Sequence, residues 1–281
     1  NPCILGELAF KIPAAFSGDL PSNIIKDAIK LAKDFPEAFV QDTPIPDISF
    51  HCDYSFTLGG IEFELIAAPG GETIDSLVVW LPQYKILFSG NQFGPLFPHY
   101  PNFNTIRGDR YRFTENYLES VRTIRALGAE TLITGHGEPI YGQELIASCL
   151  LRLETAVEYV QSETLIGIRN NKSIWDLMDT VTLPPAIKVG EGYGLVRWGV
   201  RTIWESYLGW FHQESTTELY STRHNSIYSD IVELAGFDAV AKRAAQHIAN
   251  GEPVKAIYLT EALLENDNTN PLARSLMVEA H

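Results

Sequence analysis

Four polar residues that could bind a metal ion follow apolar runs of the sequence. His136 lies between two glycines after TLIT, Glu72 and Asp75 follow FELIAAPGG, and Asn91 follows KILFSG. Because sites on layered α/β folds are usually built by the loops at strand ends, we expect these three loops to converge on one edge of a sheet. Carboxylate oxygens and an imidazole nitrogen suit a divalent metal of the zinc or manganese type.

Each of these residues also has an ordinary structural interpretation. Glu72 could cap a turn, Asn91 could adopt a left-handed turn, and His136 could bond to nearby backbone. Any one of them alone is more readily explained in this way. The occurrence of all three at strand ends favours a site.

The elements that must position these residues belong to an α/β arrangement. A helix is predicted from Ser22 to Phe35, and a β-hairpin over residues 48–71 turns at Gly59-Gly60. Two short strands flank Pro82-Gln83. An amphipathic helix over residues 114–127 and a strand over residues 130–134 complete this part.

From about residue 142 the strand signals fade and helices follow one another. The segment YGQELIASCLLRLETAVEYVQSETL predicts a long amphipathic helix, Ser173 caps another, and WGVRTIWESYLGWF predicts a third. The tail from residue 238 indicates three helices separated by an Asn-Gly break and an Asn-rich break. Its small alanines at helix-pair spacing resemble a tetratricopeptide-like unit.

The composition argues against some classes of binding partner. A formal net charge of -14 argues against nucleic acid or an anionic membrane, which would repel the chain. No run approaches the ~20 continuous apolar residues of a membrane span. The three cysteines (Cys3, Cys52 and Cys149) are scattered and suggest neither a disulfide framework nor a zinc-thiolate site.

An ordered series of motifs resembles a known family. PGGETIDSLVVWLPQYKILFSGN, NTIRGDR and ITGHGEPI resemble the second half of a metallo-β-lactamase-fold hydrolase. LPPAIKVGEGYG and GWFHQESTTELY resemble the dimerisation domain of the alkylsulfatase branch. The resemblance implies half of an αββα sandwich in residues 1–145 and an all-α dimerisation domain with the tetratricopeptide-like end in residues 146–281. It also implies a homodimer.

The same resemblance assigns ligand roles. It implies that His136 is the late histidine ligand of a two-zinc centre and that Glu72 is the glutamate used in the alkylsulfatase branch. Asn91 falls where many members carry a bridging acidic ligand, and Asp75 could compensate for its neutrality.

The resemblance also suggests substrate-binding residues. Arg107 could hold an anionic group such as sulfate bidentately, or could instead form a loop salt bridge to Asp109. Asn102 and His99 precede it as further candidates, although the family's His-Asn pair before Arg-Gly is replaced here by Pro101-Asn102.

One hallmark of the family is absent from these residues. No HxHxDH run precedes the Glu72 loop, and no two of the histidines are close in sequence: they stand at 51, 99, 136, 212, 224, 247 and 281. We therefore expect the first half of the fold to lie upstream of Asn1 or on another chain, and this chain alone to be inactive or to bind metal weakly. A missing N-terminus could also hide a signal, so the compartment, cytoplasmic or periplasmic and secreted, stays open.

Two functions are compatible with the sequence. The first is a metal-dependent hydrolase of alkyl sulfates or related small-molecule esters, acting through metal-activated water. The second is a non-catalytic dimerising scaffold or interaction module with a vestigial metal site. Glu72 and His136 at the expected spacing favour the first, and the missing ligands favour the second for this chain taken alone.

Overall fold

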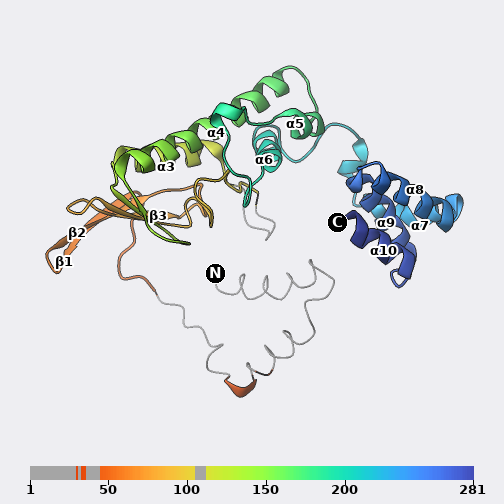
Figure 1. The fold of residues 1–281 in the computed structure, drawn as a ribbon, viewed down its shortest axis with the longest axis horizontal. Helices are drawn as coiled ribbons and strands as arrows, with labels where there is room; N and C mark the ends of the chain where they lie inside the picture. Colours follow the sequence, from red (N-terminus) through yellow and green to blue (C-terminus); the bar gives the residue numbers. More distant parts are fainter. Residues whose placement is uncertain (1–29, 31–32, 36–44, 105–111) are drawn as a thin grey trace. The chain divides into compact units, whose positions relative to one another are not determined.

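The computed structural model describes residue 30 and residues 33–35, 45–104 and 112–281 (Figure 1). The helix expected from Ser22 to Phe35 therefore lies almost entirely outside the described residues. The described part begins as a sheet, continues as long helices and ends in a smaller helical unit.

A mixed sheet of six strands forms within the described residues. In chain order the strands are β1 (Asp53–Leu58), β2 (Ile61–Ala67), β3 (Leu77–Leu81), β4 (Ile86–Gly90), β5 (Thr131–Thr134) and β6 (Ile140–Tyr141). They are neighbours in the same order, with antiparallel pairing from β1 to β4, parallel pairing of β4 with β5, and antiparallel pairing of β5 with β6. The hairpin at Gly59-Gly60 and the strands around Pro82-Gln83 are confirmed, while β6 was not expected.

Two helices cover one face of this sheet (Figure 1). They are α3 (Thr114–Ala126) and α4 (Gln143–Arg169), and both were predicted from their apolar periodicity. Glu154 of α4, which is only 8% exposed, pairs with Arg122 and Arg125 of α3 at 2.8 Å and 3.0 Å and joins the two helices.

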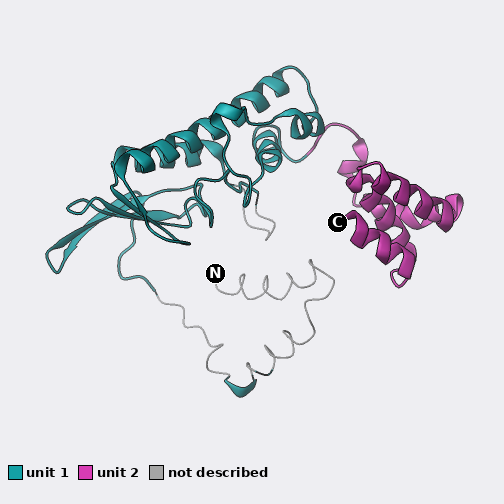
Figure 2. Ribbon diagram, viewed as in Figure 1, with its two compact units in different colours: residues 1–210 teal, residues 211–281 magenta. Residues whose placement is uncertain are grey.

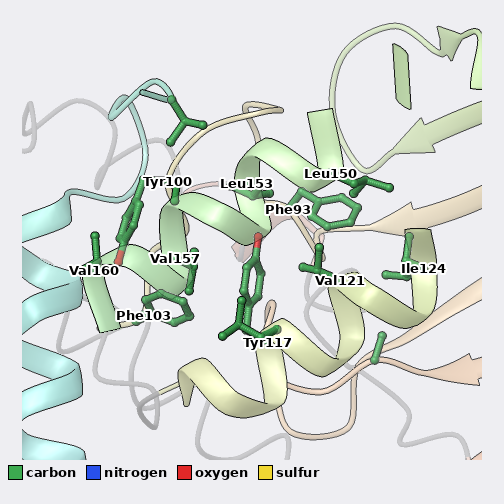
Figure 3. Close-up of a cluster of buried hydrophobic side chains, with 14 of the residues drawn as sticks. Phe93, Tyr100, Phe103, Tyr117, Val121, Ile124, Leu150, Leu153, Val157 and Val160 are labelled. Carbon is green, nitrogen blue, oxygen red and sulfur yellow. The ribbon is translucent and has the colours of Figure 1, made fainter. Parts of the chain in front are cut away.

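The core between sheet and helices is aromatic at its centre (Figure 3). Tyr117 points from α3 toward α4, and its ring meets that of Phe103 edge-on with centroids 5.4 Å apart. Phe103 meets Tyr100 in the same way at 6.0 Å. These three side chains are completely buried, so the segment before α3 is held by the core rather than lying over the surface.

Shorter helices follow α4 within the same compact unit. They are α5 (Ile174–Thr180), a 3-10 turn at Pro185–Ile187, and α6 (Val196–Leu208). Ser173 caps α5 as expected, since its hydroxyl oxygen accepts from the backbone N–H of Asp176 at 3.1 Å.

A second compact unit comprises residues 211–281 (Figure 2). It contains 3-10 turns at Thr216–Leu219 and His224–Ile227, then α7 (Tyr228–Ala235), α8 (Phe237–Ala249), α9 (Pro253–Asn266) and α10 (Pro271–Ala280). Its own core is built largely of alanine, valine and leucine. The tail helices and both of their breaks match the prediction, whereas α7 was not expected.

The boundary between the two compact units falls between residues 210 and 211. The domain boundary predicted between residues 145 and 146 rests on the family resemblance and not on compactness. It stays a prediction. None of the helices in the described ranges has the length and apolarity required to cross a membrane.

Candidate functional site

The loops after β2, β4 and β5 lie at the same end of the sheet. Ala67 at the end of β2 pairs with Leu77 at the start of antiparallel β3. Gly90 at the end of β4 pairs with Thr134 at the end of parallel β5. Since β3 and β4 are antiparallel, the start of β3 and the end of β4 share this edge. The register therefore brings together the loops that carry the candidate metal ligands.

Close glycine contacts pack these loops against one another. A Cβ on Gly71 would lie 2.4 Å from the backbone oxygen and side-chain amide of Gln92. A Cβ on Gly135 would lie 2.3 Å from Asn91 Oδ1 and 3.0 Å from the carbonyl carbon of Gly90. Only glycine fits at both positions, so the loop of Glu72 rests on that of Asn91, which rests on the loop of His136.

His136 and Asp75 are both exposed at this edge. The backbone carbonyl of His136 accepts a 2.5 Å hydrogen bond from the hydroxyl of Thr134. The carboxylate of Asp75 accepts a 2.5 Å hydrogen bond from the hydroxyl of Thr73, as in a local turn. Asp75 therefore has a local structural role, as the acceptor for the hydroxyl of Thr73.

Glu72 forms an ion pair with an arginine that the sequence did not single out. Its Oε2 lies 3.3 Å from Nη2 of Arg112, whose side chain is 4% exposed. Arg112 also donates from Nη1 to the backbone oxygen of Asn102 at 3.0 Å. A cluster of arginines just before α3 was the available signal, but the spacing did not indicate that Arg112 would be buried.

Among the residues that the structure describes, several buried polar atoms that form no hydrogen bond gather around the same segments. They are Ser89 Oγ, both amide atoms of Gln92, Asn102 Oδ1, Asn104 Oδ1, Nε and Nη2 of Arg112, and the hydroxyls of Tyr100 and Tyr117. Burial raises the pKa of both tyrosine hydroxyls, so the two phenols stay neutral at physiological pH.

His99 and Asn102 lie against a glycine-rich loop rather than beside Glu72. The backbone N–H of Gly192 donates to Nδ1 of His99 at 3.0 Å, and a Cβ on Gly190 would lie 2.4 Å from Cε1 and Nε2 of its ring. A Cβ on Gly194 would lie 2.6 Å from the backbone nitrogen of Asn102. The neutral His99 ring therefore carries its proton on Nε2.

Two groups of candidates result. Glu72, Asn91 and His136 belong to mutually packed loops, while His99 and Asn102 share the glycine-rich loop. Arg112 connects the groups through its contacts with Glu72 and Asn102. Arg107, the candidate anion-binding residue, lies outside the described residues.

The residues at this edge supply only part of a zinc site. In the portion of the chain that the structure describes, no three His, Cys, Asp or Glu side chains lie close enough to hold a metal ion. A catalytic zinc usually has three protein ligands, so the described residues do not fit one by themselves. Any metal at Glu72 and His136 requires further ligands.

Comparison with a family model and with curated proteins shows that this chain is similar to alkylsulfatases. Residues 174–281 match the family model described as "Alkyl sulfatase dimerisation". A linear primary-alkylsulfatase of Pseudomonas sp. is 26% identical over 82% of this chain and 44% of its own length. An alkyl/aryl-sulfatase of Saccharomyces cerevisiae is 25% identical over 80% of this chain and 35% of its own length. The chain thus spans less than half the length of these relatives.

The fold is shared with a solved structure. The stereoselective inverting sec-alkylsulfatase Pisa1 from Pseudomonas sp. matches with a TM-score of 0.75 at 21% identity. The match covers 84% of this chain and 38% of that one. The fold class expected from the sequence, part of a metallo-β-lactamase sandwich followed by a helical region, is thereby confirmed.

Proposed function

We propose that this chain, a relative of the alkylsulfatases that share the metallo-β-lactamase fold, contributes one half of the site of a metal-dependent hydrolase. Its substrates would be alkyl sulfates or related small-molecule esters. The single observation that carries the proposal is the packing of the Glu72, Asn91 and His136 loops at one end of the sheet. The relatives named above give the reaction class.

The metal ligands that we propose from this chain are Glu72 and His136, with Asn91 and Asp75 as further candidates. When bound, two zinc ions would acidify a water and polarise the scissile bond. The remaining ligands would come from a polypeptide segment outside these 281 residues, on the same chain or another one. The matched fraction of the relatives, 44% or less for the two named above, supports this part of the proposal.

The substrate would bind to Arg107, His99 and Asn102. Arg107 would bind the anionic group of the ester bidentately. The Nε2 proton of His99, fixed by the bond at Nδ1, would serve as a hydrogen-bond donor to the same group. Asn102 would donate a hydrogen bond to this group from its side-chain NH2. We further propose a homodimer, which the name of the matched family model supports.

A second function is favoured by one specific contact. Glu72 already has a counter-ion in buried Arg112, so its carboxylate is stabilised without a metal. A dimerising scaffold that keeps a vestigial site would retain such a contact. This alternative leads if the protein in its native form contains no metal.

The test is metal content and sulfate release from an alkyl sulfate by the natively assembled protein, together with a mass check for a second polypeptide. His136→Ala is expected to lose metal and sulfate release, whereas His224→Ala, an exposed histidine of the other compact unit, should retain both. Full metal content and rate in His136→Ala would contradict the ligand assignment. A native protein with neither metal nor activity would favour the scaffold.

A further inference from the structure

Helix α7 of the second compact unit carries large apolar side chains on its exposed side. Ile227, directly before the helix, and Ile231 within it are exposed, and Leu234 is 88% exposed. Because these residues are spaced four and three positions apart, they form one row along the helix. We call this row, made of Ile227, Ile231 and Leu234, the α7 stripe. Large apolar surfaces of this kind mark interaction sites more often than single exposed residues do.

The α7 stripe adds to an apolar surface that α7 already turns toward the core. Val232 is buried in the core of the second unit, and Tyr228 packs against that core. At 3.6 residues per turn these two side chains lie next to the stripe, and the polar side chains occupy the remaining side of the helix: Ser229, Asp230 and Glu233. A surface helix normally keeps only its core-facing side apolar. Helix α7 therefore has more apolar surface than the fold of one copy covers.

Helix α9 contributes an exposed aromatic ring beside the start of the stripe. Helices α7 and α9 pack against each other within the second unit (Figure 1). Tyr228 lines a groove together with Glu261 and Leu264 of α9. Burial raises the pKa of the Tyr228 hydroxyl, and Glu261 and Tyr258 raise it further because they lie near it. The exposed side chain of Tyr258 therefore extends the apolar surface from α7 toward α9.

We propose that the α7 stripe is the contact surface between two copies of this chain. This inference rests on the homodimer proposed above and deepens it by naming the surface. The unit that carries the stripe, residues 211–281, makes up most of the segment 174–281 that matches the family model described by dimerisation. In a contact with twofold symmetry the same patch meets itself, so an apolar row requires an equally apolar partner. A second copy supplies that partner.

The charges beside the stripe distinguish a second copy from a basic partner. Asp230 and Glu233 are exposed on α7, and Glu261 and Glu265 are exposed on α9. Two copies bring these like charges toward one another around an apolar centre, so apolar burial must hold the contact and salt should favour it by screening the repulsion. A basic partner would bind through the same carboxylates, and salt would release it. The two occupants therefore predict opposite responses to salt.

The first measurement counts the copies of this chain per particle in the natively assembled protein, by native mass spectrometry, with sedimentation to give the dimer Kd. Leu234→Glu places a carboxylate in the stripe at a highly exposed position, so the fold of one copy should be unaffected. Because a twofold contact loses the leucine twice, the Kd should rise by at least about 100-fold. Val278→Glu, at a 79% exposed position of α10, is the matched control and should keep the Kd of the parent protein.

The outcomes separate the surface from the homodimer itself. An unchanged Kd in Leu234→Glu would overturn the assignment of the surface and leave the homodimer in place, with another part of the protein covering the stripe. One copy per particle in the parent protein would overturn the homodimer and the surface together. The Kd of the parent protein should also fall or stay constant as NaCl is raised from about 0.05 M to about 0.5 M. A rise would show that ion pairs hold the contact and would overturn its apolar character.

The second measurement decides the question even if Leu234→Glu fails to fold. Ile231 stands in the middle of the stripe, so its two copies should lie near the twofold axis. In Ile231→Cys a short bis-maleimide should join two copies of the chain, clearly beyond the background that the native cysteines give in the parent protein. Val278→Cys should remain at that background. Equal cross-linking in Ile231→Cys and Val278→Cys would overturn the inference.

Discussion

Replacing Gly71 with alanine tests whether the candidate loops are packed as described. The added Cβ would lie 2.4 Å from the backbone oxygen of Gln92, whereas an ordinary contact begins at 3.4 Å. Either the Glu72 loop or the Gln92 loop must therefore move by about 1 Å. Because one of the obstructing atoms belongs to the backbone, rotation of the Gln92 side chain alone cannot relieve the clash.

The expected cost follows from this geometry. Overpacking in a well-packed region typically costs about 1–3 kcal/mol, and a backbone obstruction places Gly71→Ala toward the upper half of that range, about 2–3 kcal/mol. For a unit of 210 residues, each kcal/mol lowers the melting temperature by about 2–4 °C. A fall of roughly 4–12 °C is expected.

Thermal unfolding with Gly59→Ala as the control measures the effect. Gly59 has a positive φ of 61°, but a Cβ there would meet nothing within 4 Å. The stability that Gly59→Ala loses therefore reports backbone strain alone, about 1 kcal/mol. Gly71→Ala should be clearly the less stable variant. A loss no greater than that of Gly59→Ala would refute the packing of the two loops.

Three further predictions concern the framework around the site. Burial raises the pKa of Tyr117 above its ordinary 10.0 in the folded state, so its contribution to stability is complete below pH 10 and falls as the pH rises beyond it. Tyr117→Phe should reduce that alkaline loss in denaturation curves at pH 8 and pH 11, and should add about 1 kcal/mol at pH 8 by removing a buried hydroxyl that has no hydrogen-bond partner within the described ranges. An unchanged alkaline loss would contradict the assignment. Leu153→Ala should cost about 2–5 kcal/mol in chemical denaturation, against about 0.5 kcal/mol for half-exposed Leu151→Ala on the same helix, and equal losses would show that the core is misplaced. Glu154→Gln should cost about 1–3 kcal/mol, since it weakens a buried carboxylate between two partly exposed arginines, and a neutral result would remove its role in joining α3 to α4.

The elements of the sheet and its covering helices were predictable because their signals are local. These signals are glycine pairs at turns, alternation of apolar and polar residues in strands, and the cap at Ser173. Each acts within a few residues, and the structure contains the turn, strands and cap that they predict. The convergence of three loops was also predictable in outline, since parallel strands place their ends together. The two-residue strand β6 was missed because Ile140-Tyr141 is too short to show alternation.

The contacts that connect the site were not predictable from one sequence. The resemblance drew attention to Arg107, which lies outside the described residues, whereas Arg112, five residues farther on, is buried and lies against Glu72. Burial of this kind depends on packing with residues far away in the sequence, which spacing alone does not encode. Likewise, the ring of His99 takes the space left by the missing side chain of Gly190, a contact between residues 91 positions apart that no local pattern encodes.

The bond between His99 and Gly192 has a consequence for the order in which the chain folds. The two residues are 93 positions apart, and the whole of α4 lies between them. During synthesis from the N-terminus, the sheet edge can be made and α3 docked before Gly192 exists. His99 acquires its fixed tautomer only after the glycine-rich loop has been translated and has returned to the sheet. Closing so long a loop is entropically costly, so the segment around His99 is expected to be completed late in folding, after the strands and α3 have packed.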